Sequence, residues 1–172
     1  RRAWVEAVRE RNGDILAIQT LRNWVMTASV FASTTIVIGL GLVAASFQGL
    51  NLANLSQALS LVPTGGDLAR LKLLMLAVVF FSAFLRFVTA LRFYNHAGFL
   101  VILPAKHFQG VAEDEIAITL NRAAGQYNRG SRMFLMTIPF VLWLVGPDWF
   151  LIGVIITLLA LYRFDYLVKP GA

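Results

Sequence analysis

A long segment without any charged or histidine side chain, 23–66, constrains this chain more than any other feature. Its first half, 24–47, is almost wholly apolar. At about 1.5 Å of rise per residue, that half is long enough to cross roughly 30 Å of hydrocarbon as one helix. We therefore expect an integral membrane protein. The composition agrees, because 58% of the 172 residues are hydrophobic and only 14% are charged.

The predicted fold is an all-α, multi-pass transmembrane helical bundle. The apolar stretches are continuous and longer than the alternating strands of a membrane β-barrel. We expect one membrane domain over 1–172, with short amphipathic interfacial helices and four spans, whose approximate bounds are 24–47, 71–93, 130–145 and 148–165. The last apolar region is divided at Gly146-Pro147-Asp148. The charges decide whether this division separates two spans.

Basic residues gather in the segments that four spans would place on one side of the membrane. The segment 1–22 holds five arginines, whereas 48–70 holds only Arg70. The 94–132 segment and the tail hold Lys106, Arg122, Arg129, Arg132, Arg163 and Lys169. The positive-inside rule makes that side cytoplasmic, so the N-terminal segment and the C-terminus are both expected there. Three spans would place the basic tail outside.

Amphipathic segments are expected at three places beside the spans. Apolar positions at three- and four-residue intervals beside arginines in 1–22 suggest a basic helix on an anionic membrane surface, broken at Asn12-Gly13-Asp14. A second amphipathic helix is expected at 49–62. The predicted cytoplasmic loop over 94–129 contains a third, with the acidic residues 113–115 in its first turn.

Small residues form a stripe on each of the first two spans. Such residues let helices approach closely, so both stripes are predicted contact surfaces. The residues are Ala28, Ala32, Thr35 and Gly39 on the first span, and Ser82, Ala83, Thr89 and Ala90 on the second. The stripes could contact another membrane protein or form the internal core of this bundle, and the sequence leaves both uses open.

Arg86 is the one formal charge well inside an apolar span. An intramembrane ionisable residue is a functional candidate, although Arg86 is close enough to the cytoplasmic end for its side chain to snorkel toward the interface. We expect the guanidinium to pair with a carboxylate or a backbone carbonyl of the bundle. Asp165 and Asp14 are the acids expected near the same end.

The sequence holds little that indicates catalysis. It has no cysteine, two histidines in a loop region, and no phosphate-binding glycine loop. We expect no catalytic residues, no metal, no cofactor and no nucleic-acid partner. The formal charge of +6 is attributed to orientation and anionic lipid. Arg92, Lys106 and Arg129 are predicted to contact lipid head groups on the cytoplasmic side.

Several short stretches, in their order, resemble the uncharacterised membrane proteins of domain-of-unknown-function family 599 (DUF599). They are Leu21-Arg22-Asn23 running into Ala32-Ser33-Thr34-Thr35, Leu71-Lys72-Leu73-Leu74, Leu91-Arg92-Phe93-Tyr94-Asn95, Asn128-Arg129-Gly130 and Leu161-Tyr162-Arg163. The resemblance implies a further N-terminal span upstream. It supplies no catalytic residues, and a basic residue at position 86 fits the family pattern.

The expected protein is a multi-pass component of the bacterial inner membrane. Its predicted function is that of an accessory or scaffolding subunit that packs against other membrane proteins and lipid. A transporter or channel component, with Arg86 lining an anion path, is the alternative. A weaker alternative is an enzyme that modifies lipid head groups.

Overall fold

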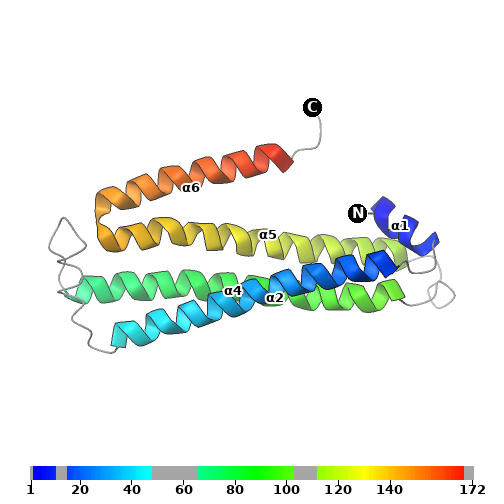
Figure 1. Cartoon of the computed structure of the whole chain (residues 1–172), viewed down its shortest axis with the longest axis horizontal. Helices are drawn as coiled ribbons and strands as arrows, with labels where there is room; N and C mark the ends of the chain where they lie inside the picture. The colour runs from blue at the N-terminus through cyan, green and yellow to red at the C-terminus, as the bar shows by residue number, and fades with distance from the viewer. Residues whose placement is uncertain (1, 11–14, 48–65, 103–111, 169–172) are drawn as a thin grey trace. The chain divides into compact units, whose positions relative to one another are not determined.

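The computed structural model describes residues 2–10, 15–47, 66–102 and 112–168, which form five α-helices and no strand (Figure 1). The helices are α1 (Arg2–Glu10), α2 (Ile15–Phe47), α4 (Gly66–Ile102), α5 (Ala112–Val145) and α6 (Pro147–Val168). The all-α prediction is confirmed. The break expected at 12–14 and the amphipathic helix expected at 49–62 lie outside the described residues.

The chain forms two compact units. Unit 1 comprises Arg1–Thr34 and Phe84–Gly130, and unit 2 comprises Thr35–Ala83 and Ser131–Ala172. The three longest helices, α2, α4 and α5, each contribute one part of their length to each unit. The single membrane domain over 1–172 stays a prediction.

Two of the described helical segments, Ile15–Phe47 and Asp67–Val101, are long and apolar enough to cross a membrane. These are longer than the predicted spans 24–47 and 71–93. Within the described part of the chain, α5 and α6 do not meet the same criteria. In α5 the apolar part begins only after Arg132, which leaves about 20 Å of helix before its end. Length and composition therefore support two of the four predicted spans.

The connection predicted over 94–129 is largely helical. The α4 helix continues to Ile102, and α5 begins at Ala112. Tyr94, Ala97 and Val101 are buried at helical spacing, so the face of α4 that packs against protein extends beyond the predicted end of the span. The prediction ended the second span at residue 93, where the sequence becomes polar. In the structure α4 continues beyond this point because its buried face still packs against protein.

Unit 1 has a continuous apolar core to which all four of its helices contribute. Its buried residues are Val5, Val8, Ala17, Leu21, Ala90, Tyr94, Ala97, Val101, Ile116, Leu120 and Ala123. Trp24 packs between Trp4 and Tyr94, with ring centroids 6.0 and 5.7 Å away. The apolar side of α1 therefore packs against protein, and the membrane-surface position expected for this segment stays a prediction.

Unit 2 contains a tight turn between α5 and α6, and α6 then runs back beside the last part of α5 (Figure 1). The helices meet closely, because a Cβ added at Gly153 would lie 2.9 Å from the Cα of Pro139. Gly146 is the one residue between the helices, and its N–H donates to the carbonyl of Leu142. The predicted division at 146–148 is confirmed.

A buried lysine donates a hydrogen bond to the C-terminal end of α5. Lys72, only 5% exposed, donates from Nζ to the backbone carbonyl oxygen of Trp143 at 3.0 Å. That carbonyl would ordinarily accept from the N–H four residues later, but position 147 is proline and has none. The ammonium group supplies the missing donor, and its charge suits the negative end of the helix dipole.

Candidate functional site: an arginine-lined pocket on α5

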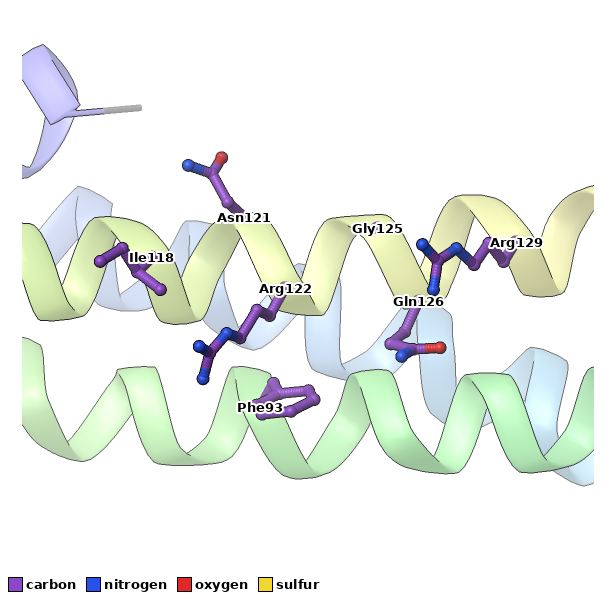
Figure 2. A pocket seen from close by; sticks show the side chains of 7 residues that line it. All are labelled: Phe93, Ile118, Asn121, Arg122, Gly125, Gln126 and Arg129. Atoms are coloured by element: carbon purple, nitrogen blue, oxygen red, sulfur yellow. The ribbon is translucent and has the colours of Figure 1, made fainter.

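Unit 1 carries a pocket of about 420 Å³, formed mainly by one face of α5. Its lining residues are Phe93 from α4 and Ile118, Asn121, Arg122, Gly125, Gln126 and Arg129 from α5 (Figure 2). The α5 members recur at intervals of three and four residues, so they share one side of the helix. The volume is within the range of about 300–1,000 Å³ that is common for small-molecule sites.

The opposite side of α5 fixes this face toward the surface. Ile116, Leu120 and Ala123 belong to the apolar core of unit 1 and are at most 1% exposed. Burying them turns Arg122 and Arg129 outward, and both side chains are exposed. Gly125 leaves room between the arginines, since a Cβ added there would meet nothing within 4 Å.

Arg86 reaches this pocket through a hydrogen bond. Its Nη1 donates to Oε1 of Gln126 at 3.0 Å. Because the guanidinium occupies the carbonyl end of the amide, the amide nitrogen remains as a donor. The partner is thus a side-chain amide, and neither the carboxylate nor the backbone carbonyl that the sequence led us to expect. Asp14 and the side chain of Asp165 lie outside the description.

The lining favours an anionic ligand. It contains two guanidinium groups and two amides, and no acidic residue. In Figure 2 the Arg122 side chain extends toward Phe93, whereas the Arg129 guanidinium bends back along α5 toward Gln126. Guanidinium groups pair well with phosphate and carboxylate oxygens because their N–H donors form a planar fork.

The predicted small-residue stripes are largely buried within the chain. In unit 1, Ala28, Ala32 and Ala90 are at most 5% exposed, and Thr89 is half-buried. In unit 2, Thr35, Gly39 and Ala83 are buried, and Ser82 is half-buried. Gly39 packs against α4, where an added Cβ would lie 3.5 Å from the Cβ of Phe80. Contacts within this chain therefore bury most residues of both stripes.

The three predicted head-group residues have different positions. Arg129 lines the pocket, and Arg92 is exposed outside the lining. Lys106 lies outside the described residues. Sequence reasoning missed Arg122 as a site residue, and it did not single out Gln126. The alternation on α5 of buried apolar positions with a polar face was the signal that could have found both residues.

The described residues bring together no group of three or more His, Cys, Asp or Glu side chains that could hold a metal ion. His96 is exposed, and His107 lies outside the description.

Fold and site together define an all-helical protein with two helices able to span a membrane and an arginine-lined pocket on a third. The chain belongs to the family described as protein of unknown function, DUF599, whose model matches residues 1–170. The family expected from the sequence is thus confirmed over nearly the whole chain. No curated protein and no solved structure matches the chain significantly.

Proposed function

We propose that this chain is a four-span protein of the bacterial inner membrane that works as a non-enzymatic accessory or scaffolding subunit. The observation that carries the proposal is the exposure of its most apolar helices. Only 22% of the most apolar 18-residue stretch of α2, and 39% of the corresponding stretch of α4, is buried inside the chain. The core helix of a water-soluble protein would be mostly buried, so this exposure supports a surrounding of lipid or of another membrane protein.

The exposed apolar surface extends to α6. Its large exposed side chains include Leu151, Ile155, Leu158 and Leu159. With one side against α5, α6 offers the rest of its surface to hydrocarbon or to a partner helix. We propose α6 as the fourth span and 130–145 as the third, with the 146–148 turn on the outer side.

Several threonine hydroxyls support a hydrocarbon environment. Thr27 and Thr34 of α2 and Thr89 of α4 donate to the backbone carbonyl four residues earlier, at 2.7–2.9 Å. A hydroxyl bonded within its own helix needs no water, which suits a polar group that faces lipid.

Single-cysteine labelling tests the four spans, because the natural chain contains no cysteine. Gln19→Cys, Asn128→Cys and Asp148→Cys each alter an exposed position. In intact cells, a membrane-impermeant maleimide should label only the Asp148→Cys protein. Permeabilisation should expose the other two. Labelling of Asn128→Cys in intact cells would contradict the proposed arrangement.

Gentle purification tests the subunit role. The tagged full chain should remain in the membrane after alkaline extraction and copurify with a reproducible set of membrane proteins. Ile155→Ser/Leu159→Ser alters two exposed positions of α6, so fewer membrane proteins should copurify while the chain itself stays in the membrane. The side of α6 that carries the buried Thr157 is left unchanged. A chain that runs alone and monodisperse would contradict the proposal.

An anion transporter remains the second candidate, and it depends on Arg86. The hydrogen bond from Arg86 to Gln126 links a cation of the second predicted span to a residue that lines the pocket. In that case purified chain in liposomes would carry chloride or phosphate, and Arg86→Gln would abolish the flux. Equal flux in empty liposomes would exclude this function.

A further inference from the structure

Two arginines of α5 line the same pocket. Arg122 and Arg129 are seven residues apart, which is about two helical turns and about 10 Å along the axis. Both are exposed and both line the same pocket, so an incoming anion can reach either guanidinium. Each guanidinium can donate two parallel hydrogen bonds to a phosphate group.

Neutral donors and apolar surface complete the lining. Arg86 holds the carbonyl end of the Gln126 amide, which leaves the amide N–H groups for a ligand. Phe93 and Ile118 provide apolar surface at the same pocket. The site therefore offers charged donors, an oriented amide and an apolar wall within about 420 Å³.

We propose that this pocket binds a phosphate-bearing anion, with the guanidinium groups of Arg122 and Arg129 as its main partners. The binding chemistry depends only on the lining residues. The source of the phosphate rests on the proposed function, because Phe93 ends the second predicted span and Arg129 directly precedes the third. In that arrangement the pocket lies at the cytoplasmic boundary of the membrane, where phospholipid head groups and free phosphates are both available.

Binding can be measured on the full chain purified in an uncharged detergent. The probes are inorganic pyrophosphate, dioleoyl phosphatidylglycerol and the net-neutral lipid dioleoyl phosphatidylcholine, and native mass spectrometry follows the bound fraction. The Arg122→Gln/Arg129→Gln protein removes two charges from the pocket. The matched control, Arg22→Gln/Arg163→Gln, removes two charges from exposed positions outside the lining.

The double pocket variant should bind the anionic probe roughly tenfold more weakly, and the control should bind like the natural chain. Loss of phosphatidylglycerol alone would assign the site to lipid, and loss of pyrophosphate alone would assign it to a soluble anion. Either result supports the proposal. Equal losses in the two variants, binding of neither anion, or equally tight binding of phosphatidylcholine would overturn it.

A second variant separates recognition from folding. Arg122→Lys/Arg129→Lys keeps both charges and removes the planar forks, so binding should fall between those of the natural chain and the glutamine variant. Circular dichroism should show the same helix content for all three variants. Because binding is measured in detergent, a failed copurification would weaken the proposed subunit role and leave this result unaffected.

Discussion

Unit 1 and unit 2 use their apolar side chains differently. Unit 1 contains a continuous buried cluster that includes Val5, Leu21 and Leu120, and it exposes charged side chains such as those of Arg22 and Arg122. Large apolar side chains are also exposed in unit 1, among them Ile15, Met26 and Phe99.

Unit 2 also buries apolar residues, including Leu76 and Phe80, but exposes far more of them. Val37, Val78 and Leu158 are each more than half exposed. Hydrocarbon chains are as apolar as these side chains, so exposure to lipid has little cost. The contrast teaches that apolar exposure is unevenly distributed along the chain and is greatest in unit 2, in agreement with the proposed membrane function.

The sharpest test of this contrast compares one leucine from each unit. Leu120 is 1% exposed in the core of unit 1, and Leu158 is 55% exposed on α6. Leu120→Ala should lower the free energy of unfolding by about 2–5 kcal/mol, because it leaves a cavity. Leu158→Ala should change it by less than about 0.5 kcal/mol. Denaturant titration in dodecyl maltoside, followed by circular dichroism, measures both, and equal losses would invalidate the comparison.

Two cations of the described residues, one buried and one half-buried, extend the comparison. Lys72 of unit 2 donates to the backbone carbonyl of Trp143, for which α5 provides no N–H donor. Arg86 of unit 1 instead donates to the side chain of Gln126, which lines a pocket. A cation fixed on the backbone is expected to act on folding. One fixed through a pocket residue is expected to act on binding.

Lys72→Met should cost about 1–3 kcal/mol of unfolding free energy, because the carbonyl of Trp143 loses its donor. The matched background is Pro147→Ala, which restores a backbone N–H four residues after Trp143. In the Pro147→Ala protein, Lys72→Met should lower the free energy of unfolding by measurably less than it does in the natural chain. The difference is obtained from a double-mutant cycle in dodecyl maltoside, and strictly additive losses would show that the lysine does not replace the missing N–H.

Arg86→Met should have a smaller effect on stability, below about 1 kcal/mol, because water in the pocket can replace the donor to Gln126. Its effect on binding of pyrophosphate or phosphatidylglycerol should be larger, since the amide loses its fixed orientation. Unfolding and native mass spectrometry on the same preparation separate the two effects. A large loss of stability with unchanged binding would make Arg86 structural, like Lys72.

The sequence predicted the helical class, the first two apolar helices and the division at Gly146, because hydropathy and a Gly-Pro pair are local signals. It ended the second span near Phe93, since polarity marks the membrane boundary but does not end a helix that packs through Tyr94 and Ala97. Local patterns also could not show that the apolar side of α1 is covered by protein.

The candidate site was predictable only in part. Arg86 and Arg129 stood out by depth and by charge, respectively. The pairing of Arg86 with Gln126 joins residues 40 positions apart, and no spacing rule within one helix reveals such a contact. The buried Lys72 was missed for the same reason, because its importance comes from a proline in another helix.

The smallest predicted effect concerns Gly125, at the centre of the pocket face. Glycine inside a helix is less stable than alanine by roughly 0.5–1 kcal/mol, and an added Cβ here would meet nothing within 4 Å. Gly125→Ala should therefore raise the unfolding free energy by up to about 1 kcal/mol. Gly130→Ala is the control in the same helix, because its Cβ would lie 3.0 Å from the Phe87 ring and crowding should cancel the gain. Equal gains at both positions in a denaturant titration would mean that the aromatic core of unit 1 yields to an added methyl group, which a tightly packed core should not do.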